Sequence, residues 1–213
     1  MRTQLGGTTT MHLYRSLFIV LAFVLCTSQA LAASTAQEVV MTTSDQVIAR
    51  LRSEQQGLAN HPEKVYALID EIVLPHFDFV RMAALVLGKN WRATGKDQKI
   101  QFVREFRRML VRTYSKALQN YTDEEIVYHP MHGDGSRGLV TVKTEIVRAQ
   151  GPAVPIDYRM HNRDGSWKVF DVVVEGISLV STHRSEFDSA IRQGGIDGLI
   201  ADLKGRNDKA ISS

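Results

Sequence analysis

One stretch, from Trp167 to Phe187, constrains the fold most, because its strand-like part is apolar on both faces. An antiparallel strand with one face in water alternates apolar and polar residues. Here Val169, Phe170 and residues 172–174 place apolar groups on both sides, before a break at Glu175-Gly176. Each side of this strand therefore needs an apolar cover. Protein can cover both sides, or protein can cover one side and a bound apolar ligand the other.

The N-terminus has the pattern of a secretory signal peptide. Arg2 and Arg15 form a basic leader, residues 17–25 form an apolar run, and Ala30-Leu31-Ala32 is a small-x-small cleavage site. The run is too short and wrongly flanked to be a stable membrane span. We expect residues 1–32 to be removed, which places the mature protein in the periplasm.

The mature chain is expected to be one domain, residues 33–213, whether Met1 or Met11 is the start codon. Cys26, the only cysteine, lies in the leader, so disulfides, zinc–thiolate sites and cysteine nucleophiles are excluded from the mature protein. Without the two arginines of the leader, 24 basic and 23 acidic residues leave a net charge of +1. This near-neutral charge argues against binding of nucleic acid by counterion release.

The first half of the mature chain has the periodicity of helices. Thr94 is expected to cap the long helix, and Gly88 to end the helix before it. The expected helices are residues 38–60, 62–72, 77–87, 94–121, 179–192 and 196–204.

The second half of the mature chain has the two-residue period of strands, interrupted by short turns that predict antiparallel hairpins. The expected strands are residues 125–129, 139–148, 154–162 and 166–175. The expected fold is α+β, with a helical N-terminal half and C-terminal helices packed around a curved four-stranded antiparallel sheet that encloses an apolar pocket.

The histidines do not form a typical metal-binding pattern. His129 and His132 flank a proline in a turn, and His76 stands two residues before Asp78. Either pair could ligate a metal, but loop histidines far more often face solvent, so we expect no metal. The sequence also has no phosphate-binding glycine loop and no Gly-x-Ser-x-Gly nucleophile motif.

A pocket enzyme stays open as an alternative function. Burial in an apolar pocket can tune a carboxyl pKa for acid–base catalysis, and Asp157, Asp171 and Tyr114 are the candidates. The competing interpretation is that both carboxylates lie on a solvated or hydrogen-bonded sheet face while Tyr114 packs in the core. An abnormal carboxyl titration would distinguish the two interpretations.

Three segments carry a family resemblance: LPHFDFVRMAALVLGKNWRATGKDQ from Leu74, FVREFRRMLVRTYSKAL from Phe102 and WKVFDVVVEGISLVSTHRSEF from Trp167. The segment Gly195–Ile200 fits as well. In these segments the chain resembles the MlaC family, also called the toluene-tolerance family, which consists of periplasmic phospholipid-carrying proteins of the Mla system. The resemblance covers residues 37–204, nearly the whole mature chain.

This resemblance implies a soluble carrier without catalytic residues or a cofactor, with phospholipid as its cargo. It implies a monomer that shuttles lipid between an outer-membrane Mla lipoprotein–porin complex and an inner-membrane Mla ABC transporter complex that maintain outer-membrane lipid asymmetry. It also implies that Ile177 and Tyr114 border the acyl-chain pocket. A different apolar ligand, such as a single-chain lipid or a quinone, remains the main alternative.

The physics of the cargo fits such a carrier. Exposing about 30 methylene groups of two acyl chains, at ~0.8 kcal/mol each, would cost on the order of 20 kcal/mol. The chains therefore need a pocket near or above about 1,000 Å³. For the strand at 166–175, either Phe170, Val172 and Val174 or Val169 and Val173 face the ligand, and we choose the first set. The expected lining is Phe106, Leu110, Tyr114, Leu118, Val140, Val142, Ile146, Ile156, Tyr158, Met160, Phe170, Val172, Val174 and Ile177. The head group is expected at the mouth, beside Arg92 or Lys99.

Overall fold

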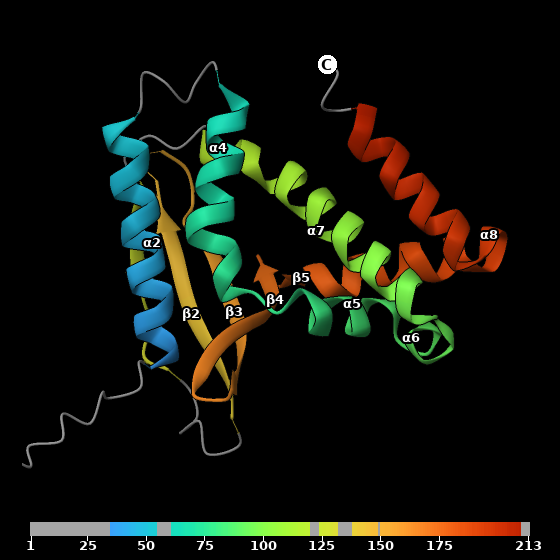
Figure 1. Cartoon of the computed structure of the whole chain (residues 1–213). Coiled ribbons are helices and arrows are strands. Elements are labelled where there is room, and N and C mark those ends of the chain that lie inside the picture. Colours follow the sequence, from blue (N-terminus) through green and yellow to red (C-terminus); the bar gives the residue numbers. More distant parts are fainter. Residues whose placement is uncertain (1–34, 55–60, 120–123, 132–137, 149, 210–213) are drawn as a thin grey trace, which may run out of the picture. The chain divides into compact units, whose positions relative to one another are not determined.

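The computed structural model of the chain describes residues 35–54, 61–119, 124–131, 138–148 and 150–209. The expected signal peptide, residues 1–32, lies outside these ranges. The described residues form helices, then an antiparallel sheet, then a further long helix (Figure 1). This order of elements confirms the α+β class.

The helices lie largely where the sequence periodicity predicts them. They are α2 (Ala36–Ser53), α4 (Pro62–Leu68), α5 (Phe79–Leu87), α6 (Asn90–Ala93), α7 (Lys96–Gln119) and α8 (Leu179–Lys209). A π-helical segment, η1 (Ile69–Val73), and a 3₁₀ turn, η2 (Leu74–His76), continue α4. Gly88 ends α5 with a φ of 54°, and Gly195 interrupts α8 with a φ of 67°, both as expected.

The two long N-terminal helices begin differently from one another. Thr35 and Glu38 form a reciprocal capping box at the start of α2, with distances of 3.2 and 2.7 Å. The expected capping role of Thr94 is wrong, because its hydroxyl donates to the Asn90 carbonyl at 2.8 Å and so ends α6. Gln98 instead accepts from the backbone N–H of Gly95 at 2.9 Å, just before α7.

The sheet has five strands in sequence order, one more than expected. They are β1 (Glu125–Tyr128), β2 (Leu139–Val147), β3 (Val154–Arg163), β4 (Ser166–Val174) and β5 (Ile177–Ser178), each antiparallel to the next. Glu175 and Gly176 have φ angles of 51° and 81°. Two consecutive positive φ angles are typical of a type I′ turn, which joins two strands directly. The break expected at Glu175-Gly176 is therefore a hairpin that adds the fifth strand.

A bulge in β4 changes which side chains share a face. Arg159 pairs with Asp171, but the next residue of β3, Met160, pairs with Val169, so Phe170 has no partner on β3. Beyond such a bulge the alternation shifts by one residue. Val169 therefore shares a face with Val172 and Val174, and the simple alternation that grouped Phe170 with them is wrong.

In the described part of the chain, the core consists of three clusters. Cluster 1 joins α5, α7 and α8 around Met82, Phe102, Phe106, Leu110, Phe187 and Leu203, with Phe170 packed against it. Cluster 2 joins α2 to the inner face of the sheet through Ala36, Val40, Val140, Val142, Met160, Val169 and Val172. Cluster 3 joins α2 to α4 and η1 through Val47, Leu51, Val65, Leu68 and Ile69, with Leu118 of α7 packed against it. Figure 1 shows α2 alongside the strands, and α7 running from α6 toward α4.

Candidate functional site

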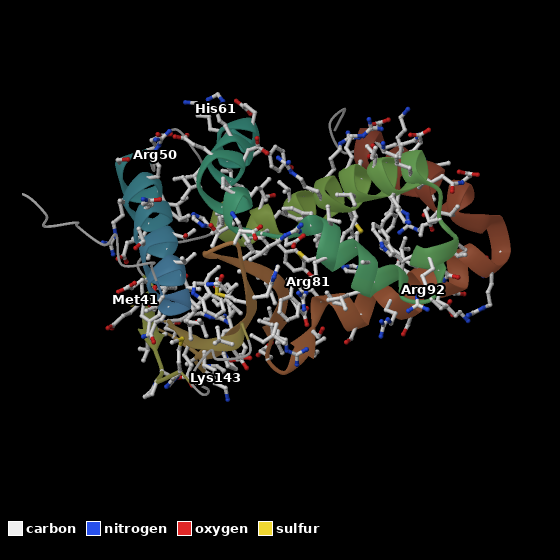
Figure 2. All side chains as sticks on the ribbon, turned by 60° about the horizontal axis from the view of Figure 1, so that its bottom comes forward. Met41, Arg50, His61, Arg81, Arg92 and Lys143 are labelled. Carbon is white, nitrogen blue, oxygen red and sulfur yellow. The ribbon has the colours of Figure 1, made fainter. Side chains whose placement is uncertain are left out.

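An open cleft of about 650 Å³ lies between α2 and the η1–η2 segment. Its lining residues are Gln46, Ala49, Arg50, Ser53, Glu71, Ile72, Pro75 and His76. Figure 2 shows Arg50 near the C-terminal end of α2. Three of these side chains, Ala49, Ile72 and Pro75, supply apolar surface, and the others are polar or charged.

The wall opposite α2 comes from the irregular end of a helix. The backbone N–H of Leu74 bonds to the Ile69 carbonyl, five residues back, which is the π-helical spacing. Pro75 has no N–H to continue a helix, and Phe77 closes a 3₁₀ turn by donating to the Leu74 carbonyl at 3.1 Å. Short π-helical segments are frequent at functional sites, whereas 3₁₀ turns are common at helix ends.

Charged and titratable groups meet at the cleft. Arg50 Nε lies 2.6 Å from Glu54 Oε1, and Arg50 Nη2 lies 3.6 Å from Glu71 Oε2. Burial lowers the pKa of His76, and the positive charge of Lys168 lowers it further. His76 is therefore a neutral imidazole at neutral pH, with one nitrogen that donates and one that accepts.

The cleft borders the apolar interior. Ile72 lines the cleft and also packs against cluster 3. On the other wall, Ala49 and Arg50 lie in the same turn of α2 as Val47 and Leu51. Val47 and Leu51 belong to the same cluster. A ligand in the cleft would thus lie beside buried hydrocarbon.

The structure brings together most of the sheet residues expected to line the pocket. The members of this set on the inner face, in or packed against cluster 2, are Val140, Val142, Ile156, Tyr158, Met160, Val172 and Val174. Ile146 pairs with Val154 and Ile126 and is half-buried. The helix α2 covers this face, and its Ala36 and Val40 side chains pack against the apolar side chains of the sheet.

The other expected lining residues are dispersed. Phe106 and Leu110 are buried in cluster 1, and Phe170 packs against the same cluster. Tyr114 and Ile177 are large apolar side chains at the surface, 40% and 63% exposed. For the expected head-group contacts, Lys99 Nζ lies 5.0 Å from the ring centroid of Trp91, and Arg92 is exposed on α6. None of these residues is in the lining of the cleft beside α2. The sequence analysis did not predict that cleft.

Tyrosine hydroxyls lie on the inner face of the sheet. Burial raises the pKa of Tyr158 to about 12, with a further contribution from nearby Tyr128, while a hydrogen bond with Thr144 partly offsets it. Burial also raises the pKa of Tyr128. Both hydroxyls therefore stay protonated and neutral, which suits a face that meets apolar groups.

Asp171, a candidate for acid–base chemistry, accepts hydrogen bonds that connect parts of the fold. Its Oδ2 accepts from Ser178 Oγ at 2.7 Å and from Arg159 Nη1 at 3.1 Å, and its Oδ1 accepts from the backbone N–H of Val180 at 3.1 Å. These partners come from β3, β5 and α8. Tyr114, the expected companion, lies on α7. The geometry favours the structural interpretation of Asp171.

Within the described ranges, no group of three or more histidine, cysteine, aspartate or glutamate side chains is placed to hold a metal ion. Of the His129–His132 pair considered from the sequence, His132 lies outside those ranges. Asp78 bonds to His161 at 3.0 Å, whereas His76 lines the cleft. No helix in the part of the chain that the structure describes is long and apolar enough to cross a membrane.

Comparisons with known proteins agree with one another. The family model described as MlaC protein matches residues 41–205. The Intermembrane phospholipid transport system binding protein MlaC of Haemophilus influenzae is 24% identical over 190 residues, with 88% of each chain covered. The Toluene tolerance protein ttg2D of Pseudomonas putida is 29% identical over 188 residues, covering 87% of this chain and 85% of that protein.

A solved structure is also similar. It is the phospholipid-binding protein from Ralstonia solanacearum in complex with a phospholipid, with 29% sequence identity and a TM-score of 0.77. The match covers 83% of this chain and 98% of that one. Nearly the whole of the neighbour's chain is therefore matched.

Proposed function

The chain belongs to the MlaC family, and we propose that it is a soluble periplasmic phospholipid carrier. It shields acyl chains in an apolar pocket and shuttles lipid between the outer-membrane and inner-membrane Mla complexes. Residues 33–213 form its lipid-binding domain after removal of the signal peptide, and the protein acts as a monomer. Its partners are the inner-membrane Mla ABC transporter complex and the outer-membrane Mla lipoprotein–porin complex.

The phospholipid bound to the Ralstonia solanacearum protein supports this proposal most directly, because 98% of that chain matches this one at a TM-score of 0.77. The name of the Haemophilus influenzae relative, a binding protein of an intermembrane phospholipid transport system, supports the shuttling role. Moving lipid from a bilayer into an apolar pocket exchanges one apolar medium for another and is close to neutral in free energy. Such a carrier needs no catalytic group.

The acyl-chain pocket is proposed to use the sequence-predicted residues that share the inner face of the sheet, with Tyr114 and Ile177 at its border. The inner-face side chains of cluster 2 support this assignment, since they form one continuous apolar surface. Tyr114 and Ile177 support it in another way, because exposed apolar side chains at those positions suit the border of a pocket.

Organic extraction of the purified mature protein followed by lipid mass spectrometry tests the function. The expected result is diacyl phospholipid bound in a stoichiometric amount. Single-chain lipids or quinones in the extract would favour a carrier of another apolar ligand. A protein that carries no lipid, and takes none from phospholipid vesicles, would contradict the proposal.

A further inference from the structure

The inner face of the sheet is covered by the helix α2. Val142 and Met160 of this face are 0% exposed, and they lie in cluster 2 together with Ala36 and Val40 of α2. The acyl chains of the proposed cargo need the same apolar surface that α2 now covers. A cover made of protein must therefore move before an acyl chain can bind to this face.

The two halves of α2 pack against different parts of the protein. The N-terminal half, with Ala36 and Val40, contacts the sheet in cluster 2. The C-terminal half, with Val47 and Leu51, packs against α4 and η1 in cluster 3. Figure 1 shows the C-terminal end of α2 beside α4, and the strands alongside the rest of the helix. One helix thus joins two separate clusters of the core.

The contact of α2 with the sheet is the weaker of the two. Each half of the helix buries one valine, but the second buried residue is Ala36 in the N-terminal half and Leu51 in the C-terminal half. A leucine side chain removes more apolar surface from water than an alanine side chain does. An ion pair of 3.6 Å between Arg50 and Glu71 adds a polar contact with η1 in the C-terminal half.

A buried polar atom makes the contact between α2 and the sheet still less favourable. Burial raises the pKa of the Tyr128 hydroxyl on β1, and nearby Ser44 of α2 partly offsets this effect. Among the residues that the structure describes, however, this buried oxygen has no partner at normal hydrogen-bond geometry. An unbonded buried hydroxyl costs free energy, and water pays back that cost when the helix moves away.

We propose that α2 is a hinged cover of the acyl-chain pocket, whose N-terminal half lifts from the sheet to admit lipid while its C-terminal half stays packed on α4 and η1. The inference rests on the proposed function, because it describes how the cargo reaches the pocket. Thr43 lies between the two halves, and its hydroxyl donates to the Val39 carbonyl at 2.7 Å. Bonds of this kind often bend a helix, so Thr43 marks a place where α2 can change direction.

The open state is accessible because the helix and the sheet both keep their main interactions. The capping box between Thr35 and Glu38 lies at the start of α2 itself, so it moves with the helix. An acyl chain that replaces α2 covers the same apolar surface, and one apolar contact is exchanged for another. Opening is costly only while neither α2 nor lipid covers the sheet. The rate of lipid uptake therefore depends on how readily the N-terminal half leaves.

A matched pair of valines tests the hinge. Val40 and Val47 of α2 are 5% and 7% exposed, and they belong to cluster 2 and cluster 3. The mature protein, stripped of lipid, is mixed with a phospholipid that has a fluorescent acyl chain, presented in detergent micelles, and uptake is followed with time. Val40→Ala removes two methyl groups from the sheet contact and should speed uptake by roughly tenfold. Val47→Ala removes the same groups from the hinge and should leave the rate unchanged.

Reversible cross-links provide a second test. The only cysteine of the chain, Cys26, lies in the expected leader, so pairs of introduced cysteines can be joined selectively by a short bifunctional thiol reagent that a reductant removes. Ser44→Cys with Tyr128→Cys joins α2 to the sheet and should abolish uptake until the link is reduced. Arg50→Cys with Glu71→Cys joins α2 to η1 and should leave uptake unchanged.

The possible outcomes separate this inference from the proposed function. If the wild type takes up no lipid from micelles or vesicles, the carrier function fails, and the inference fails with it. If the wild type takes up lipid but the two valine variants change the rate equally, or neither changes it, α2 is not hinged as proposed. Normal uptake with the link to the sheet in place, or blocked uptake with the link to η1, would also overturn the hinge and leave the carrier function standing.

Discussion

The buried carboxylate of Asp171 accepts a hydrogen bond from the backbone N–H of Val180 at 3.1 Å and so joins β4 to the first turn of α8. The Asp171 residue is only 2% exposed, and its second oxygen is bonded to Ser178 and Arg159. A negative charge at a helix N-terminus is also favoured by the helix dipole. Asp171 therefore anchors the end of the sheet to the C-terminal helix.

Replacing Asp171 should weaken the fold and not the carriage of lipid. Asp171→Ala leaves the Val180 N–H without its partner, so we expect the free energy of unfolding to fall by about 2–4 kcal/mol. Asp171→Asn should lose less, because one oxygen remains. Urea unfolding measures the loss, and mass spectrometry should show unchanged lipid per folded protein. Asp157→Asn serves as the control. Normal lipid content with lost transport would revive an active role for these carboxylates.

The acid stability of the protein should depend on Glu105. This α7 side chain is 1% exposed and bonds to Asn207 of α8 at 3.0 Å, and also to Arg104 and Arg108. Burial acts to raise the pKa of Glu105, but the hydrogen bonds from Asn207 and Arg104 and the charge of Arg108 outweigh it, so the pKa lies below its ordinary value of 4.5.

A lowered pKa in the folded state makes the charged form stabilising. The contribution of Glu105 is complete above the unfolded-state value near 4.5 and is lost as the pH falls through the lower folded value. Glu105→Gln should cost about 1–3 kcal/mol at pH 7 and flatten the decline of stability below pH 4.5. Urea unfolding at several pH values checks this, with the exposed Glu186→Gln as the matched control. An equal slope in wild type and Glu105→Gln would contradict it.

Asp78 connects α5 to the sheet with both carboxylate oxygens. Oδ1 accepts from the backbone N–H of Arg81 at 2.8 Å, and Oδ2 lies 3.0 Å from His161 Nε2. Asp78→Asn keeps a good N-cap, whereas Asp78→Ala removes both contacts, and loss of a cap alone costs about 1 kcal/mol. We therefore expect the alanine variant to be less stable than the asparagine variant in thermal unfolding. Equal stabilities would mean that the cap contributes nothing.

Local sequence patterns predict the elements of this fold but not how they meet. Gly88, Gly195 and the Asp164-Gly165 turn have the positive φ angles that their positions in the pattern require. The bulge at Phe170 has no such local signature, because it depends on how β4 pairs with β3. From the sequence, the hydroxyl of Thr94 could cap the start of α7. In the structure it bonds to the Asn90 carbonyl of the preceding helix α6.

The candidate site shows the same limit. The inner-face residues of the sheet follow from a two-residue period, so most of that set meets in cluster 2. The cleft is formed by residues 46–53 and 71–76, which have no common motif. Only the packing of α2 against the irregular η1–η2 segment brings Arg50 and Glu71 together, and a linear pattern contains no information on that contact.

The border of the acyl-chain pocket can be tested with a pair of exposed isoleucines. Ile177 of β5 is 63% exposed and Ile100 of α7 is 59% exposed, so a glutamate at either position should leave the fold intact. An acyl chain that passes Ile177 would bury the new carboxylate without a partner, at a cost of several kcal/mol. Ile177→Glu should therefore purify with at least about a hundredfold less phospholipid, while Ile100→Glu keeps the wild-type amount. Native mass spectrometry distinguishes the empty and loaded proteins. Retention of lipid by a folded Ile177→Glu protein would place the border of the pocket elsewhere.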